Sequence, residues 1–441
     1  MPSLVARRSS LTLALAVFFV GGAARADGFS FTKGPYLQGL GQRSVVVRWE
    51  GFPAAPATVT VTRPGGPARE IKTAEATSFH SVELTGLEPG TTYGYVVKAN
   101  ETRSADGHFT TAPEATKPFT FLAYGDNRSD AASHEAIVKA MLRVPSDFLV
   151  HSGDMVLEGN VDDDWNAFFA IEAPLLRDRC VFACVGNHEL IGRGEPPFLR
   201  YFHPAARGEK TLTYSVRWSN ARFFFLNAMA PWDAGADKAW IERELTAADA
   251  EAGVDHRFVV LHHSPFSTGP HGDNASFDRA GIPEMLRAHK VSLVLAGHDH
   301  VYERGEKDGL RYLITGGGGA PLYPQGKKRS AATIAFESAF HFVEVAVDGK
   351  ALTTTARRPD GSILERCAIP AEGPWTCEGL APLPKPPPPP TTPTSPDPPK
   401  KSCACAMPGT DARGSTPPFA LGSALLALVV RSRLRRRRQI S

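Results

Sequence analysis

Short apolar runs, each followed at once by a polar residue, recur through the middle of the chain. They occupy residues 119–124, 147–151, 180–185, 257–261 and 291–296. Between the first two runs, residues 133–143 space their apolar side chains as a helix does. Apolar runs that alternate with helical patterns predict an α/β sheet, in which chemistry gathers at the carboxyl ends of the strands. The polar residues after the runs are therefore the candidates for function.

Residues 28–113 have a different pattern, without helical spacing. Residues 82–84 and 93–98 alternate apolar and polar side chains, and residues 44–49 are rich in β-branched types. Gly, Pro, Asn and Asp separate these segments. Short strands at such spacing predict an all-β sandwich.

Changes in pattern along the chain mark its expected domains. We expect an N-terminal domain at 27–113 and an α/β domain at 118–366, with its last sheet strand at 342–347. A dense proline run predicts an extended linker at 381–402, because such a segment cannot bury a core. Residues 403–441 then carry a cysteine pair, a short apolar stretch and an arginine cluster. This order resembles the MYXO-CTERM type of C-terminal sorting tag, which implies association with a membrane or the cell surface.

The first 26 residues have the features of a secretory signal peptide. Arg7 and Arg8 precede an apolar stretch at 11–22, and small residues follow at a cleavage site before Asp27. The arginine pair leaves Sec and twin-arginine export both open. The C-terminal apolar stretch at 419–430 is shorter than the about 20 residues of a transmembrane helix, so we expect a processed tag or a marginal anchor. The protein is expected to be exported and to be periplasmic, at the cell surface (outer membrane) or secreted.

Composition limits the partners and the cysteine chemistry. Hydrophobic residues make up 42% and charged residues 22% of the 441 residues, so most of the chain should be globular. A net charge of +3 is too small to indicate a nucleic-acid partner. Cys180 and Cys184 would lie about 13 Å apart on a strand, too far to bridge, and should be buried thiols. Cys367 and Cys377 flank a Gly-Pro-Trp turn and could bridge.

Six polar residues at the strand ends have side chains that bind metal ions. They are Asp126, Asp154, Asn187, His262, His298 and His300. All offer oxygen or imidazole nitrogen and none offers a thiolate, a set that suits Fe, Zn, Mn or Co. A carboxylate that bridges two cations about 3.5–4 Å apart forms a clamp for in-line displacement at phosphorus. The residues therefore predict a site for two divalent or trivalent metal ions, whose identity the sequence does not fix.

The motifs around these residues resemble a known family. The chain resembles the calcineurin-like metallophosphoesterase superfamily in Gly125-Asp126, Gly153-Asp154, Gly186-Asn-His-Glu189, His262-His263 and Gly297-His-Asp-His300. Residues 297–304 resemble the purple acid phosphatases in particular, and residues 34–38 resemble the opening of their N-terminal domain. Residues 84–93 resemble a fibronectin type III-like corner, which a tyrosine closes. The implied fold class is an N-terminal all-β sandwich (fibronectin type III-like) followed by an α/β metallophosphoesterase domain, a two-sheet β-sandwich flanked by helices.

The resemblance implies a role for each matching residue. The first metal would bind Asp126, Asp154 and His300, and the second would bind Asp154, Asn187, His262 and His298. His262 is preferred to His263 because His271 follows it by nine residues, where the family often has a histidine that faces the phosphate. His188 would bond the phosphate and protonate the leaving oxygen, and Glu189 would orient a ligand.

Two positions depart from the family pattern. The superfamily usually has Asp-x-His at the first motif, where this chain has Asp126-Asn-Arg128, and purple acid phosphatases have a tyrosine in place of Leu157. The first metal thus loses one ligand by either route, and a tyrosinate-iron colour should be absent. Water, Asn127 or His134 could complete the ligand set of the first metal. Arg128 could instead hold a substrate phosphate through its bidentate fork, or form a structural ion pair.

The implied function is an exported metal-dependent phosphatase, which hydrolyses small-molecule phosphate monoesters with a dinuclear centre and a metal-bound hydroxide nucleophile. His188, His271 and Arg128 would be its catalytic residues. A phosphodiesterase or nucleotidase on the same site is one alternative, and a non-catalytic surface binding protein with a degraded metal site is another. The substrate pocket is expected at residues 190–204, 228–236 and 264–278, with Phe202, Trp232 and Phe266 against the alcohol part.

Overall fold

The computed structural model describes residues 28–202, 211–230, 232 and 236–384. The expected signal peptide at 1–26, the expected tag at 403–441 and the linker beyond residue 384 lie outside these residues. Among the helices that the structure describes, none has both the length and the apolar composition needed to cross a bilayer.

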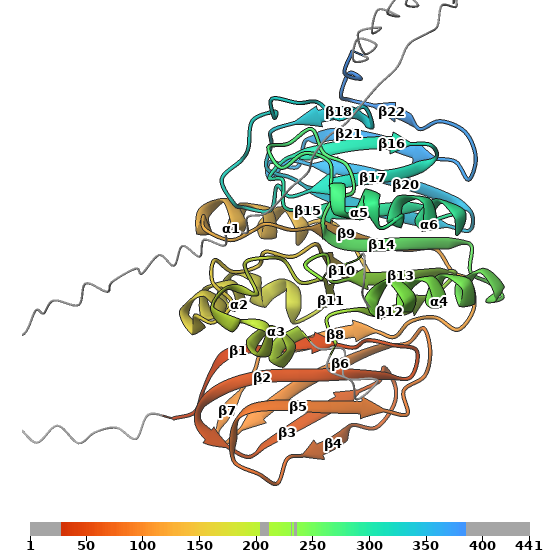
Figure 1. The fold of residues 1–441 in the computed structure, drawn as a ribbon. Coiled ribbons are helices and arrows are strands. Elements are labelled where there is room, and N and C mark those ends of the chain that lie inside the picture. Colours follow the sequence, from red (N-terminus) through yellow and green to blue (C-terminus); the bar gives the residue numbers. More distant parts are fainter. Residues whose placement is uncertain (1–27, 203–210, 231, 233–235, 385–441) are drawn as a thin grey trace, which may run out of the picture. The chain divides into compact units, whose positions relative to one another are not determined.

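The N-terminal domain consists of strands alone (Figure 1). They are β1 (Ser30–Gln38), β2 (Ser44–Ala55), β3 (Ala57–Thr62), β4 (Arg69–Lys72), β5 (Thr77–Thr85), β6 (Thr92–Ala99), β7 (Thr102–Arg103) and β8 (Gly107–Thr110). One sheet has the order β1-β2-β5, and the other has the order β4-β3-β6-β7 with β8 also paired to β6. The backbone N–H of Glu88 donates to the Tyr93 hydroxyl at 2.9 Å, which closes the predicted tyrosine corner. The predicted all-β sandwich is therefore confirmed.

The second domain is built on two seven-stranded sheets (Figure 1). The first sheet has the order β11 (Cys180–Ala183), β10 (Phe148–His151), β9 (Phe119–Tyr124), β19 (Phe342–Asp348), β20 (Ala351–Arg357), β21 (Ile363–Ile369) and β22 (Thr376–Glu378). The second has the order β12 (Tyr214–Trp218), β13 (Ala221–Leu226), β14 (His256–His263), β15 (Leu293–Gly297), β17 (Leu310–Thr315), β16 (Tyr302–Lys307) and β18 (Thr333–Glu337). The helices are α1 (Ala131–Met141), α2 (Asp162–Leu176), α3 (Glu195–Phe202), α4 (Ala236–Ala250), α5 (Ala275–Arg279) and α6 (Ile282–Ala288), with a 3₁₀ turn η1 (Ile191–Arg193).

Aromatic side chains fill the space between the two sheets. The ring centroid of Phe121 lies 5.4 Å from that of Phe148 in its own sheet. It lies 5.2 Å from Phe223 and 5.3 Å from Phe258, which belong to the opposite sheet. Separate apolar clusters join α1 and α2 to the first sheet and α4, α5 and α6 to the second. The predicted two-sheet sandwich flanked by helices is confirmed.

The segment at 34–38 joins the two domains. Tyr36 Oη donates to the carbonyl oxygen of Tyr201 at 3.1 Å, and its ring packs 4.8 Å from that of Phe169. Gln38 Nε2 donates to the carbonyl oxygen of Val181, in β11, at 3.1 Å. The motif that pointed to a family thus positions the N-terminal domain against the second domain.

The expectation of a last sheet strand at 342–347 was wrong. This segment forms β19, which lies in the middle of the first sheet between β9 and β20. The sheet continues through β21 to β22, beyond the expected domain end at residue 366. Thr and charged residues interrupt the apolar side chains of these added strands, so they lack the continuous runs of the central strands.

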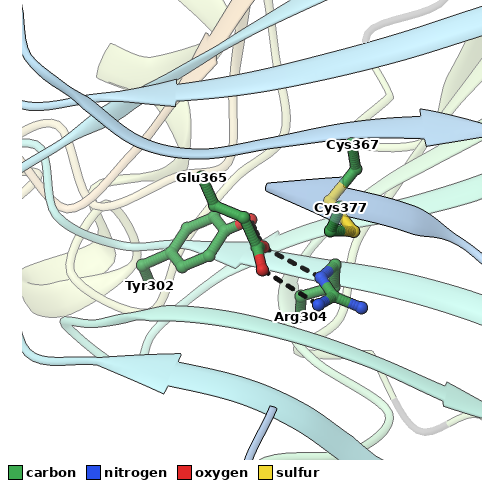
Figure 2. The surroundings of a disulfide bond; sticks show 5 residues. All are labelled: Tyr302, Arg304, Glu365, Cys367 and Cys377. Carbon is green, nitrogen blue, oxygen red and sulfur yellow. Dashed lines mark hydrogen bonds and ion pairs between the residues drawn. A yellow bond between two sulfur atoms is a disulfide. The ribbon is translucent and has the colours of Figure 1, made fainter. Parts of the chain in front are cut away.

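The predicted cysteine chemistry is confirmed in the described residues. Cys367 and Cys377 face each other on β21 and β22 and form a disulfide, with a Cα–Cα distance of 4.1 Å (Figure 2). Cys180 and Cys184 are free and buried. Burial raises the pKa of the Cys180 thiol to about 12, so it stays protonated and unreactive.

Part of the 297–304 motif stabilises the fold beside this disulfide. Arg304 in β16 donates two hydrogen bonds to the Glu365 carboxylate in β21, at 2.8 and 2.9 Å. Tyr302 Oη donates to the same carboxylate at 2.7 Å, as Figure 2 shows. Tyr302 and Arg304 belong to the second sheet and Glu365 to the first, so this buried group joins the two sheets.

Candidate metal centre

The predicted donors meet where strands of both sheets end. In the first sheet, the parallel strands β9, β10 and β11 end shortly before Asp126, Asp154 and Asn187. In the second sheet, His262 lies near the end of β14, and His298 directly follows β15, which runs parallel to β14. We call the six predicted donors the centre. Their placement follows the rule that α/β sheets present functional residues at the carboxyl ends of parallel strands.

Short distances join the donors of the centre. His262 Nε2 lies 3.3 Å from Asp154 Oδ1 and 3.1 Å from Asn187 Oδ1. The backbone N–H of His298 donates to the two carboxylate oxygens of Asp126, at 3.2 and 3.0 Å. Residues more than 170 positions apart in the sequence therefore lie in contact.

Three residues of the centre have backbone conformations that side chains rarely adopt. The angle φ is +57° at Asp126, +58° at Asp154 and +71° at His298. The neighbouring glycines are needed for space: a Cβ on Gly297 would lie 2.3 Å from Asp126 Oδ2, and one on Gly186 would lie 2.2 Å from Asp154 Oδ1. The Gly-Asp and Gly-His pairs thus turn the chain sharply. Gly186 and Gly297 leave the space in which the donors approach one another.

Glu189 holds two of the donor loops together. Its buried carboxylate accepts hydrogen bonds from the backbone N–H groups of Asp154 at 2.8 Å, Met155 at 2.7 Å and Gly186 at 2.8 Å. Burial, with a contribution from the charge of Asp154, raises the pKa of Glu189 to about 7. The predicted orienting role therefore has a geometric basis, and it acts on the backbone of the loops.

The position expected for the second metal, at Asp154, Asn187, His262 and His298, has a well-oriented histidine. A carbonyl oxygen can only accept, so the 2.8 Å contact between His262 Nδ1 and the Ser152 oxygen puts the proton on Nδ1. Nε2 faces the Asp154 carboxylate and the Asn187 amide oxygen, and it would offer its lone pair to a cation on losing its proton. Such a carbonyl partner is the usual way in which a metal-binding histidine is fixed.

His263 belongs beside this position as well, although the sequence analysis set it aside. Its ring centroid lies 3.9 Å from that of His298, and its Nε2 is buried without a hydrogen-bond partner. His262, His263 and His298 offer nitrogen atoms within 4.8 Å of one another, as do the donor atoms of Asp126, Asp154 and His262. The pair of adjacent histidines was the sequence signal, and both of its members reach the centre.

The charges of the centre act on one another. Burial alone would lower the pKa of His262, but the carboxylates of Asp154 and Asp126 raise it to about 9. Burial and the nearby His262 lower the pKa of His263 to about 4. Burial favours the neutral form of Asp154, yet the neighbouring His262 and His188 hold the pKa of that carboxyl below its usual range. Asp154 thus supplies the negative charge of the centre, whereas burial raises the pKa of the Asp126 carboxyl well above its usual range.

The position expected for the first metal, at Asp126, Asp154 and His300, contains an arginine side chain. His300 Nδ1 donates to the Pro321 carbonyl oxygen at 2.7 Å, so its Nε2 lone pair faces inward, 3.6 Å from Asp126 Oδ1. Arg128 Nε donates to Asp154 Oδ2 at 3.1 Å, and its Nη2 donates to His300 Nε2 at 3.3 Å. The guanidinium therefore lies between two of the three donors expected for the first metal.

Asn127 and His134, which could have completed the first position, are engaged elsewhere. The Asn127 amide contacts His134 Nε2 at 2.8 Å and His151 Nε2 at 2.9 Å. His134 Nε2 also contacts Glu172 Oε1, at 2.7 Å. These side chains form a buried network beneath the centre, so their polar atoms already have partners.

The two histidines expected to act on substrate lie beside the centre. His188 Nδ1 donates to the Leu157 carbonyl oxygen at 2.6 Å, and its Nε2 lies 3.9 Å from Asp154 Oδ2. His271 Nδ1 contacts Asp299 Oδ1 at 2.7 Å, and its ring centroid lies 3.9 Å from that of His298. Each histidine thus has one ring nitrogen held by the protein and one free for a ligand.

Two neighbouring cavities open beside these histidines. A cavity of about 300 Å³ is lined by His263, His271 and His298. It shares His271 with a cavity of about 780 Å³, which Phe266 and Lys307 line. Of the three expected pocket segments, 264–278 lines both cavities, whereas no described residue of 190–204 or 228–236 lines either one.

Phe202 and Trp232 do not have the predicted pocket role. Phe202 is 2% exposed and packs among the aromatic rings of α2 and α3. Trp232 is 1% exposed and packs against Phe277. Both are core residues, which a sequence cannot distinguish from residues that line a pocket.

Known families match both domains. Residues 119–302 match the family described as Calcineurin-like phosphoesterase, and residues 35–111 match the one described as Purple acid Phosphatase, N-terminal domain. A purple acid phosphatase from yellow lupin (Lupinus luteus) seeds superposes with a TM-score of 0.64 at 18% identity, covering 75% of this chain and 73% of that one. At this identity the likeness shows the fold alone.

Relatives are also found by sequence. An uncharacterized protein of Mycobacterium tuberculosis is 25% identical over 279 residues, covering 54% of this chain and 52% of the relative. A phosphoenolpyruvate phosphatase of Allium cepa is 30% identical over 174 residues, covering 36% of this chain and 35% of that protein. The matched region therefore spans about half of the first relative and about a third of the second.

Proposed function

We propose that this protein is a metal-dependent phosphatase acting on phosphate monoesters. Residues 119–302 match the calcineurin-like phosphoesterases and residues 35–111 match the N-terminal domain of purple acid phosphatases, and the two matches together support a phosphoester hydrolase. The observation that carries this proposal is the second metal position. There His262 Nε2 approaches Asp154 and Asn187 to 3.3 and 3.1 Å, beside His298. Four metal-binding side chains from distant segments converge there, and this convergence supports a bound cation.

The donor set fits a metal ion of intermediate hardness. Its carboxylate, amide and imidazole groups suit Fe, Zn or Mn, and no thiolate competes. His263, with an unpartnered buried Nε2, adds a nitrogen at the same place. Asp154, Asn187, His262 and His298 would hold a cation there, which would supply activation of water and neutralisation of charge on the phosphoryl group. The family leads one to expect two cations, and the proposed reaction requires at least the one at the second position.

The chain's own residues would orient the phosphate and move the proton. His188 carries its proton on Nδ1, which is bonded to the Leu157 carbonyl, so Nε2 is the atom that faces the phosphate. When protonated there, it would donate to the leaving alkoxide oxygen. His271 is held by Asp299 and would bond a phosphate oxygen, and Arg128 would add a fixed positive charge.

The cavities favour a small phosphate ester. The cavity of about 300 Å³ beside His263 and His298 has room for a phosphate group, and the larger cavity of about 780 Å³ for the alcohol part. Phe266 would contact an apolar portion of that group. Lys307 lies 4.9 Å above its ring and would favour a substrate that carries further negative charge.

The same proposal includes an exported location. The disulfide between Cys367 and Cys377 supports it, because disulfides persist mainly in oxidising compartments. The signal peptide at 1–26 and the tag at 403–441 would deliver the protein to the periplasm, the outer membrane surface or the medium.

The test is a comparison of two chromogenic substrates on the purified protein. We expect p-nitrophenyl phosphate to be hydrolysed faster than bis(p-nitrophenyl) phosphate, with activity lost on chelation and restored by Zn²⁺ or Mn²⁺. Asn187→Ala should lose at least about 100-fold of the rate, whereas His108→Ala, on the exposed face of the N-terminal domain, should retain it. Faster diester hydrolysis would favour a phosphodiesterase or nucleotidase. A protein that binds no metal would favour the non-catalytic binding module.

A further inference from the structure

We propose that the Arg128 guanidinium takes the place of the first metal ion, so that the centre binds one cation, at the second position. This inference rests on the proposed function only in requiring that the second position binds a metal. It departs from the dinuclear centre that the family leads one to expect.

The first position has lost donors at two separate places. Residue 128 is arginine where Asp-x-His would supply an imidazole, and residue 157 is leucine where a tyrosine would supply a phenolate. The Leu157 side chain is 44% exposed and brings no donor atom. The nearby amide of Asn127 and ring of His134 are bonded within the buried network. Neither Asn127 nor His134 therefore replaces the missing ligand.

Two of the three donors of the first position face the arginine. Asp154 Oδ2 accepts from Arg128 Nε at 3.1 Å, and His300 Nε2 accepts from Arg128 Nη2 at 3.3 Å. These are the lone pairs that a cation would use. A guanidinium is positive at every pH at which the protein is folded, so a second cation at this place would meet a fixed like charge.

The arginine is held in this place by several contacts. Its Nη1 donates to the Ser129 hydroxyl at 3.2 Å, and its side chain is only 11% exposed. The Tyr323 ring stacks on His300 with centroids 4.0 Å apart and so fixes the imidazole that faces Arg128. The guanidinium is thus packed between groups of the protein, unlike a side chain that extends into solvent.

The donor atoms that could bind a metal gather around His262, which belongs to the second position, although one of the two groups also contains Asp126 and Asp154. Both groups of three donor atoms found at the centre include His262, and neither includes His300. The second position also gains His263, whose Nε2 has no other partner in the described residues. The centre therefore places several histidine nitrogens at the second position and the Arg128 guanidinium at the first.

The inferred arrangement defines what Arg128 does. Its charge offsets that of Asp154, the carboxylate expected to bridge two metals, and its remaining N–H groups can donate to a phosphate oxygen at the centre. Arg128 would then bind the substrate phosphate and balance the charge of the centre. Unlike a metal ion, this positive charge cannot dissociate from the protein.

Counting bound Zn²⁺ tests the inference directly. The full chain is stripped with a chelator, reloaded with Zn²⁺, desalted and analysed by elemental mass spectrometry. We expect one equivalent per chain in the wild type and in Arg128→Lys, which keeps the charge. Arg128→His restores Asp-x-His and should bind two, whereas Arg43→His, at an exposed arginine of the N-terminal domain, should bind one.

A second measurement does not depend on retention during desalting. With Mn²⁺ in place of Zn²⁺, the electron paramagnetic resonance spectrum should be that of an isolated ion in the wild type and of a spin-coupled pair in Arg128→His. Two equivalents and a coupled pair in the wild type would overturn the inference while leaving the phosphatase proposal standing. No bound metal in the wild type would overturn both.

Discussion

The two metal positions of the centre share one carboxylate and differ in almost everything else. Around the second, Asn187, His262 and His298 converge, and His262 is oriented by a carbonyl oxygen behind it. Around the first, the Asp154 oxygen and the His300 nitrogen that face inward are bonded to Arg128. The two positions look equivalent in the order of motifs along the chain. The difference shows that motifs with regular spacing can place their residues in unlike surroundings.

The largest effect should come from removing the histidine at the heart of the second position. His262→Ala takes away a side chain that contacts both Asp154 and Asn187 through one nitrogen. We expect loss of bound Zn²⁺ and a fall in phosphate release of at least about 100-fold. Far-ultraviolet circular dichroism should be unchanged, and unimpaired Zn²⁺ binding would place the metal elsewhere.

A direct comparison of the two positions uses the paired histidines of one loop. Substituting a residue that only orients a metal ligand typically lowers metal affinity by about 10–100-fold. Because His298 would itself be a ligand, His298→Ala should weaken Zn²⁺ binding by more than about 100-fold. His300→Ala should change it little, because the His300 nitrogen that faces inward is bonded to Arg128. Calorimetric titration measures both. Equal losses would mean that the two positions bind metal alike.

A smaller effect is expected from the residue that holds the donor loops. Glu189→Gln replaces one accepting oxygen by an amide that cannot accept from the backbone N–H groups of Asp154 and Gly186. We expect about a 10-fold loss in Zn²⁺ affinity, with a parallel loss in rate. Glu135→Gln, on an exposed turn of α1, is the matched control and should behave as the wild type. An unchanged affinity would show that the loops keep their places without this carboxylate.

The smallest effect should follow from adding a donor where the first position lacks one. Leu157→Tyr supplies the phenol that purple acid phosphatases have there, while Arg128 still carries its charge. We expect an unchanged Zn²⁺ count, and no visible tyrosinate band after loading with iron. The same substitution combined with Arg128→His should produce the band. A coloured single variant would show that the arginine yields its place.

Much of the fold could be predicted because its signals are local. The run at 119–124 coincides with β9, and the alternating segment at 93–98 lies within β6. The polar residues after the apolar runs also proved to share one edge of the sheets, since parallel strands impose this on any sequence. Partners far along the chain could not be predicted. Nothing near Arg304 indicates Glu365, and nothing near Arg128 indicates that its guanidinium meets His300.

The 297–304 motif shows the same limit within eight residues. Its first half, with His298 and His300, reaches the centre, as the sequence predicted. Its second half is structural: Tyr302 and Arg304 bond a buried carboxylate of the opposite sheet. The motif as a whole indicates a family. Which of its residues reach the centre and which stabilise the fold can be seen only from the positions of their side chains.

The left-handed backbone at Asp126, Asp154 and His298 has a practical consequence for engineering. Such conformations cost on the order of 1 kcal/mol each for residues with a side chain, and glycine relieves that cost. A library selected only for a higher melting temperature would therefore enrich glycine at the three places where the protein can least afford to lose a ligand. Screens on this scaffold should score bound metal together with thermal resistance, so that inert but robust clones are recognised as such.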